Sequence, residues 1–213
     1  MNINWVDTFT FPAYNYTTDI KSALARNQKL VHISSNEVFN CTNQAFIPEL
    51  YYHDPKTPEG REEVRRELEI FNSGVQFLLI RVPMWLFGYS CPSMIEEIAE
   101  WNGGEPLKLS ARWAGTPTYS TDVVMIIKYL MRQGAVGIYH VANAGNATEF
   151  SWGNYVANRL GKPEAVVPLD PDEKTDYIHP LLDIEKVIKD VGFGIPKWTN
   201  AIDRYIEARE LHV

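Results

Sequence analysis

The sequence contains almost no cysteine and no long apolar run. Its 213 residues include two isolated cysteines, Cys41 and Cys91, which make neither a disulfide framework nor a zinc site. No segment approaches the roughly 18 consecutive apolar residues that a membrane-spanning helix needs, and residues 1–15 lack the basic and apolar regions of a signal peptide. These absences predict a reduced, cytoplasmic protein with no membrane partner.

Positive charge is also scarce. Lysine and arginine total 20 against 27 aspartates and glutamates, which gives a formal net charge of −7. Binding to nucleic-acid phosphates requires a basic patch, so this balance argues against a nucleic-acid partner. The five histidines show no metal-ligand spacing. We therefore expect no metal, and we expect His32 and His140 to be hydrogen-bonded residues of strands.

Helical stretches alternate with short apolar strands, and this order is typical of βαβ units with a parallel sheet. We therefore predict an α/β fold. Pro58 and the glutamates after it suit a helix start, and Ser120 to Asp122 offer an N-cap. The expected strands cover residues 29–34, 75–82 and 135–141, with 3–7 as a possible further strand and 8–16 as loop. The expected helices cover residues 18–27, 58–71, 120–132, 155–160 with a lead-in from 150, 183–190 and 198–210.

Five segments carry motifs that resemble those of one enzyme family, and they occur in its order along the chain. The segments are LVHISSNEVF at 30–39, LIRVPMWLFG at 79–88, GTPTYSTD at 115–122, GIYH at 137–140 with its continuation to 152, and the closing stretch from HPLLD at 179–183 to GFGIPKW at 192–198. They resemble the dTDP-4-dehydrorhamnose reductases, which are extended short-chain dehydrogenase/reductases acting on nucleotide sugars.

The resemblance implies a Rossmann-like parallel sheet with flanking helices and a small C-terminal substrate-binding lobe. We expect one unit over residues 1–213, with the sheet core in about 1–90 and 118–145, and the lobe and C-terminal helices in about 91–117 and 146–213. The Gly-rich turn that holds a dinucleotide in this fold is missing from the sequence. We therefore expect an N-terminally truncated chain that binds no cofactor, or a recorded fragment of a longer chain.

The resemblance also implies a catalytic set of a Ser/Thr, a Tyr and a Lys four residues after the Tyr. Ser35 occupies the Ser/Thr position, as a relic. An ungapped alignment from Ser35 puts Glu59 at the Tyr position and Glu63 at the Lys position. Reversing the lysine charge beside a phosphate-bearing cofactor is repulsive. Tyr52 and Lys56 have the same spacing, but they precede Pro58 in a stretch that cannot be a helix interior. We expect no catalytic residue.

Glu59 and Glu63 project from one helix face because they stand at i and i+4. Such a pair can hold a metal or perform acid–base chemistry. A solvated face, on which Glu62 reaches Arg66, is the favoured interpretation.

The substrate-binding candidates implied by the resemblance come from three segments. Trp85 lies near the family's sugar-stacking tryptophan and either stacks on a ligand or joins the core. The loop with Thr116 and Thr118 shapes the family's substrate pocket, and a structural role is favoured for it here. His179 replaces an arginine, which removes a bidentate partner for a pyrophosphate. The full candidate set is Ser35, Asn36, Trp85, Thr116 and Thr118.

Two functional hypotheses follow. The first is a non-catalytic member of the family that binds a nucleotide sugar or acts as a structural or interaction protein. The alternative is an NAD(P)-dependent nucleotide-sugar reductase completed by a separate N-terminal chain. An open sheet edge at the strand nearest the N-terminus invites pairing with another chain, so we expect a homo-oligomer or a protein partner. The aromatic residues that would cover this edge or form the contact are Trp5, Phe9, Phe11, Tyr14 and Tyr16.

Overall fold

The computed structural model describes residues 15–40, 46–89, 91, 93–170 and 180–210. The predicted strand at 3–7, almost all of the predicted loop at 8–16, Cys41 and His179 lie outside these residues. Tyr16 falls inside them and belongs to a short strand rather than to a loop.

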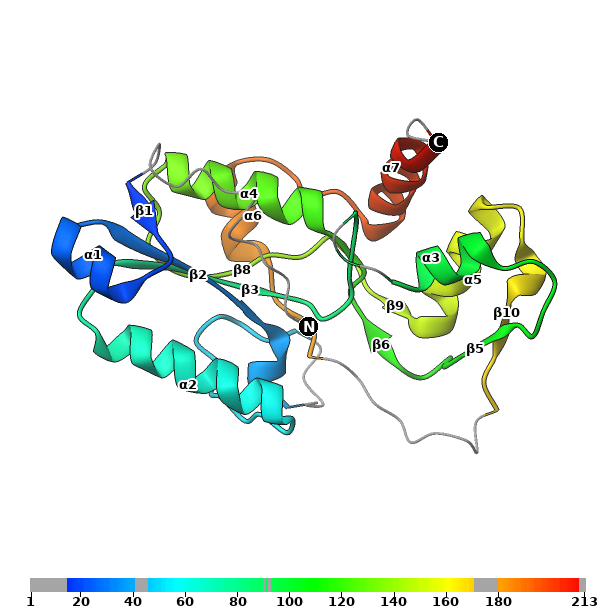
Figure 1. Ribbon diagram of the computed structural model, residues 1–213, viewed down its shortest axis with the longest axis horizontal. Helices are drawn as coiled ribbons and strands as arrows, with labels where there is room; N and C mark the ends of the chain where they lie inside the picture. The colour runs from blue at the N-terminus through cyan, green and yellow to red at the C-terminus, as the bar shows by residue number, and fades with distance from the viewer. Residues whose placement is uncertain (1–14, 41–45, 90, 92, 171–179, 211–213) are drawn as a thin grey trace.

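The larger part of the molecule is built around a four-stranded parallel sheet (Figure 1). Its register runs from Leu30 opposite Phe77 to Ser35 opposite Val82, and the last strand continues it with Arg81 opposite His140. The α/β prediction is confirmed, because each crossover between parallel neighbours contains a helix. In sheet order, the strands are β1 (Tyr16–Thr17), β2 (Lys29–Ser35), β3 (Phe77–Val82) and β8 (Gly137–His140).

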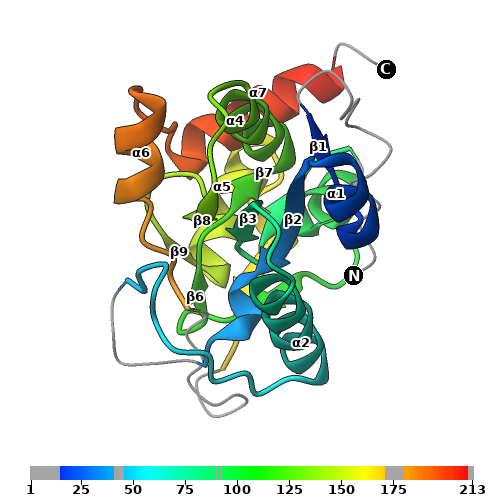
Figure 2. The same ribbon diagram turned by 90° about the vertical axis from the view of Figure 1, so that its left-hand side faces the viewer.

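Helices cover both faces of this sheet (Figure 2). α1 (Ile20–Arg26) and α2 (Pro58–Asn72) pack on one face through a small core that includes Leu30, Ile70 and Leu79. α4 (Ser120–Arg132) and α6 (Glu185–Val191) pack on the other face over a larger apolar core. The strands are therefore enclosed on both sides, which explains why they appear in the sequence as near-continuous apolar runs.

The predicted N-cap at Ser120 to Asp122 is wrong. The N-cap residue of α4 is Tyr119, which makes no side-chain capping bond, and Ser120 is already helical. Strand β7 (Thr118–Tyr119) pairs with β4 (Leu86–Phe87) and runs directly into the helix. The extended backbone that an N-cap needs therefore falls on Tyr119 rather than on the hydroxyl residues after it.

The smaller lobe has its own apolar core, which includes Phe87, Ile95, Trp152, Val156 and Tyr205. Two short strand pairs accompany three helices there (Figure 1). The strands are β5 (Leu107–Leu109) with β10 (Val166–Pro168), and β6 (Ala114–Gly115) with β9 (Ala147–Thr148). The helices are α3 (Met94–Glu100), α5 (Glu149–Arg159) and α7 (Trp198–Glu210), with one 3-10 turn, η4 (Pro163–Ala165).

A buried polar junction, centred on Asn143, links the two parts. The Asn143 amide nitrogen donates to Asp122 Oδ2 at 2.7 Å and to the Pro196 carbonyl at 3.1 Å, and its oxygen accepts from the Tyr119 N–H at 2.8 Å. Arg204 of α7 adds a bidentate pair to Asp122, at 2.8 and 2.6 Å. These bonds fix α4 and α7 to the segment that follows β8.

No helix in the described part of the chain is long and apolar enough to cross a bilayer.

Candidate functional site

The candidate residues Ser35 and Asn36 lie at the carboxyl end of β2, where open parallel sheets bind their ligands. The Ser35 hydroxyl accepts from the Glu37 N–H at 3.2 Å and so caps the 3-10 turn η3 (Asn36–Val38). Asn36 is buried. Its amide nitrogen donates to the Pro180 carbonyl at 2.9 Å, and its oxygen accepts from the Met84 N–H at 3.1 Å. Asn36 thus joins three segments, and its contact with a ligand stays a prediction.

The first turn of α2 is pressed against η3. A Cβ added at Gly60 would lie 2.2 Å from the Glu37 carbonyl oxygen, so glycine allows this close approach. Thr57, the N-cap of α2, accepts from the Gly60 N–H at 2.9 Å and donates its hydroxyl proton to Glu37 Oε1 at 3.1 Å. The helix that carries the substituted Tyr and Lys positions therefore starts beside the end of β2.

Three carboxylates share this corner. Burial raises the pKa of Glu37 above its ordinary value, the nearby charges of Glu59 and Glu63 raise it further, and the Thr57 hydrogen bond acts in the opposite direction. Glu59 is exposed and Glu63 is partly buried. The place at which the resemblance implies a tyrosine and a lysine thus carries negative charge in this chain.

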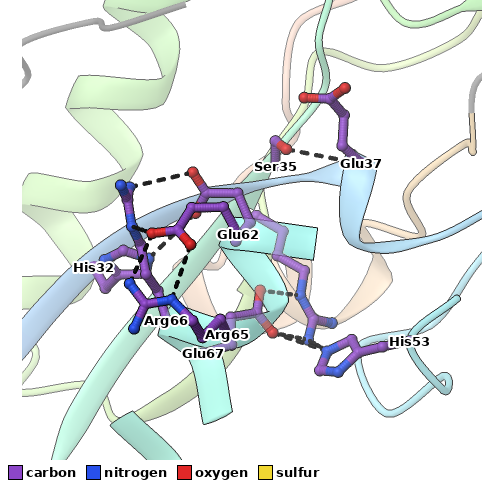
Figure 3. A network of polar contacts seen from close by, with 10 residues as sticks. His32, Ser35, Glu37, His53, Glu62, Arg65, Arg66 and Glu67 are labelled. Atoms are coloured by element: carbon purple, nitrogen blue, oxygen red, sulfur yellow. Dashed lines mark hydrogen bonds and ion pairs between the residues drawn. The ribbon is translucent and has the colours of Figure 1, made fainter. Parts of the chain in front are cut away.

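Glu63 faces the sheet rather than open solvent. Its Oε2 lies 3.6 Å from His32 Nε2 of β2, and its Oε1 lies 3.5 Å from Arg66 Nη1. The predicted contact between Glu62 and Arg66 is confirmed at 3.2 Å, and Arg65 holds the same carboxylate with two further bonds (Figure 3). The solvated-face interpretation therefore fits Glu62 better than it fits Glu63.

The alternative pair, Tyr52 and Lys56, does not lie on a helix. Both precede the N-cap of α2, in a stretch without regular secondary structure. Tyr52 is 65% exposed and stacks on Tyr51 with ring centroids 4.4 Å apart, and Lys56 donates to Asp54 at 3.4 Å. This confirms that no helix face presents the two together.

Trp85 follows β3 and packs against the smaller lobe. Its ring stacks on Trp152 at 5.3 Å, and a Cβ added at Gly115 would lie 2.8 Å from it. The Trp85 side chain is nevertheless only partly buried. The core-packing interpretation of Trp85 is confirmed, and stacking on a ligand stays a prediction.

Thr116 and Thr118 are both buried. The Thr118 hydroxyl donates to the Thr116 carbonyl at 3.1 Å and accepts from the Asn143 N–H at 3.2 Å. Their described contacts hold loops together, and a direct contact with substrate stays a prediction.

A buried ionic cluster beneath α2 was missed by sequence reasoning. Arg81 of β3 is 1% exposed and binds the fully buried Glu67 of α2 through two bonds, at 2.9 and 2.6 Å. Its third contact is with the Glu49 carbonyl at 2.9 Å, and Phe39 covers its guanidinium at 4.9 Å. The available signal was an arginine inside an apolar strand, because a buried arginine requires a partner.

Two histidines complete this cluster. His53 Nε2 lies 2.9 Å from Glu67 Oε2 and 2.9 Å from Arg81 Nη2, so it stands between the two charged groups (Figure 3). Arg81 Nη1 lies 3.4 Å from His140 Nε2. Burial lowers the pKa of His140 to about 3, and the Arg81 charge contributes. Neutral His140 therefore accepts from Arg81.

Glu67 remains ionised although it is buried. Burial raises its pKa, but hydrogen bonds from Arg81 and His53 and the charge of Arg81 outweigh burial and lower the pKa to about 2. The cluster ties α2, β3 and residues 49–53 together. Among the residues that the structure describes, no group of three or more His, Cys, Asp or Glu side chains could hold a metal ion.

The chain shares its fold with solved structures of dTDP-4-dehydrorhamnose reductases. The structure of dTDP-4-dehydrorhamnose reductase from Bacillus anthracis in complex with NADP superposes with a TM-score of 0.79 at 20% identity, covering 89% of this chain and 68% of that one. The Clostridium acetobutylicum structure of the same enzyme gives 0.78 at 17% identity, covering 90% and 69%. At these sequence identities, structural similarity shows a shared fold and no more.

The chain belongs to the RmlD substrate binding domain family, whose model matches residues 18–211. The spore coat polysaccharide biosynthesis protein SpsK of Bacillus subtilis is 25% identical over 185 residues, and the dTDP-4-keto-6-deoxy-D-glucose reductase of Streptomyces niveus is 28% identical over 153. The chain spans 64% and 52% of the length of these relatives. The family expected from the motifs is confirmed.

Proposed function

We propose that this chain is a non-catalytic member of its family, which binds a nucleotide sugar or acts as a structural and interaction protein, and takes up no dinucleotide. The observation that carries the proposal is the carboxylate corner formed by Glu37, Glu59 and Glu63, which arises because α2 starts beside the end of β2. Neither Glu59 nor Glu63 can take the roles that the resemblance implies for tyrosine and lysine.

The size of the charge repulsion expected at position 63 supports the proposal that the chain no longer binds a dinucleotide. Two unit charges about 4 Å apart interact by roughly 4 kcal/mol near a protein surface. Replacing lysine by glutamate at position 63 changes an attraction for a phosphate-bearing cofactor into a repulsion of similar size. The Glu63 side chain is also held between His32 and Arg66, so it does not simply turn away.

A nucleotide sugar is the proposed ligand of the non-catalytic form. Support comes from the carboxyl ends of β2 and β3, because Ser35 ends β2 and the partly buried Trp85 comes shortly after β3. The Streptomyces niveus relative is a dTDP-4-keto-6-deoxy-D-glucose reductase, named for a dTDP-linked keto sugar. Binding of such a molecule here requires neither the tyrosine nor the lysine.

Thermal unfolding with added ligands tests the proposal. NADPH and NADH are expected to leave the melting temperature unchanged, whereas one of a panel of dTDP-, UDP- and GDP-sugars is expected to raise it. A ligand at 100 times its Kd stabilises the fold by about 2.7 kcal/mol, which is easily measured. The double variant Glu59→Tyr, Glu63→Lys is expected to gain affinity for NADPH.

Glu69→Lys is the matched control, because Glu69 is an exposed glutamate at the far end of the same helix. It makes the same charge reversal and is expected to leave NADPH binding unchanged. Stabilisation of the unaltered chain by NADPH would overturn the non-catalytic proposal. If no nucleotide sugar raises the melting temperature, the structural and interaction role is the only one of the proposed roles that is left.

A second candidate is a reductase completed by a separate chain. The observation in its favour is the outer edge of β2. β1 pairs only with Lys29 and Leu30, and no other described residue pairs with the outer side of Val31 to Ser35. An unpaired strand edge accepts an additional strand from another chain, and such a chain would have to supply the dinucleotide site.

The same edge supports the proposal of a homo-oligomer or a protein partner. Ile33 is the residue to alter, because it lies in the part of β2 that β1 leaves uncovered and is only partly buried. Light scattering after size-exclusion chromatography is expected to show a species larger than 24.4 kDa, and Ile33→Pro is expected to reduce it to one chain. A single-chain mass for the unaltered protein would contradict the homo-oligomer.

A further inference from the structure

The turn between α3 and β5 contains the only Asn–Gly pair of the sequence, Asn102–Gly103. Both residues are exposed. Gly103 has a φ of +96°, and a Cβ added there would meet nothing within 4 Å. No other part of the described chain therefore crowds the backbone at Gly103.

The flanks of this turn are held while its centre is not. The Trp101 ring N–H donates to the Gly104 carbonyl at 3.2 Å, and Lys162 Nζ donates to the Trp101 carbonyl at 2.7 Å. Within the described part of the chain, Asn102 and Gly103 take part in no hydrogen bond. No bond opposes rotation of the Asn102 side chain onto the following backbone nitrogen.

We propose that Asn102 is a site of spontaneous deamidation. The Gly103 backbone nitrogen attacks Cγ of Asn102, a new C–N bond forms, the bond from Cγ to Nδ2 breaks, and ammonia leaves with the proton of the backbone N–H. Water then opens the five-membered imide at either carbonyl. The products carry aspartate or isoaspartate at position 102, and the reaction consumes one water and releases one ammonia.

Asn72–Ser73 provides an internal comparison. Asn72 is the last residue of α2, and the Ser73 N–H donates to the Ile70 carbonyl at 3.1 Å. The nitrogen that would attack is therefore engaged, and the helical backbone fixes its geometry. The structure assigns slow deamidation to Asn72 and fast deamidation to Asn102.

The reaction alters the smaller lobe and leaves the carboxylate corner unchanged. The turn follows α3, at the opposite end of the molecule from α2 (Figure 1). Either product adds one negative charge to a chain whose net charge is already −7. Isoaspartate also inserts a methylene into the backbone beside Trp101, whose carbonyl Lys162 holds.

Peptide mapping by mass spectrometry tests the proposal. The full-length chain is incubated in mildly alkaline buffer, and samples are taken over days together with the Asn102→Gln variant. The peptide with Asn102 is expected to gain the mass of an amide-to-acid exchange and to become a substrate for isoaspartyl methyltransferase. Asn102→Gln is expected to remove both signals, because glutamine would have to form a larger ring.

A sample unfolded in urea supplies the reference rate. The folded chain is expected to modify Asn102 at a rate comparable to the unfolded chain, and to modify Asn72 many times more slowly than the unfolded chain does. An Asn102 rate in the folded protein as suppressed as that of Asn72 would show that the turn protects the site, and the proposal would be wrong.

Discussion

Replacing Arg81 by alanine is expected to lower the free energy of unfolding by about 3–5 kcal/mol, because it leaves the Glu67 carboxylate buried without its partner. Glu67 is 0% exposed and receives two bonds from Arg81. The substitution also leaves the Glu49 carbonyl without its donor. Urea denaturation followed by circular dichroism measures the change.

Two variants separate the broken pair from the lost side chain. The double variant Arg81→Met, Glu67→Leu removes both charges while keeping the volume, and it is expected to cost much less than Arg81→Ala. Arg65→Ala breaks an exposed pair with Glu62 on the same helix and is expected to change stability little. If Arg81→Ala cost no more than Arg65→Ala, the buried pair would not support the fold.

Acid is expected to destabilise the protein in two successive windows. The pKa of His140 is about 3 in the folded chain against an ordinary 6.5, so the unfolded chain binds a proton first. The stability that His140 contributes is complete above pH 6.5 and is lost as the pH falls towards 3, with a slope of at most about 1.4 kcal/mol per pH unit. Glu67, with a pKa of about 2 against 4.5, adds a second loss between pH 4.5 and 2.

The variant His140→Phe isolates the first window. Phenylalanine fills a similar volume beside Phe39, whose ring contacts His140 at 5.8 Å, and it does not titrate. Arg81, Glu67 and Glu49 are the charged groups that face this position. Unfolding free energies between pH 7 and 4.5 are expected to fall less steeply for His140→Phe. Identical slopes for the two proteins would rule out His140 as the source.

Long elements were predictable because their signals are local. Pro58 marks the start of α2, and the predicted ranges of α4 and α7 agree with the structure. Helix α3 was missed although Ser93 and Glu96 form a capping box, which is a pattern visible in the sequence. The two-residue strands leave no comparable signal, since pairing between distant loops creates them.

Sequence motifs could predict which residues belong to the candidate site, but not the contacts that these residues make with distant segments. Glu37, two residues after Ser35, does lie near Glu59 and Glu63, since α2 begins beside the end of β2. The engagement of Asn36 by Pro180 and Met84 was not predictable, because it depends on segments far apart in the sequence. The pairing of Arg81 with Glu67 was hidden for the same reason.

The position of β8 in the sheet has a consequence for synthesis on the ribosome. β3 pairs with β8 through Leu78 and Gly137, which lie roughly sixty residues apart, and such distant pairings form late. Until β8 has emerged, β3 has β2 on one side and an open apolar edge on the other. Nascent chains with such edges aggregate readily, so the interval in which residues 83–136 are translated is the one in which chaperones that shield strands have most to protect.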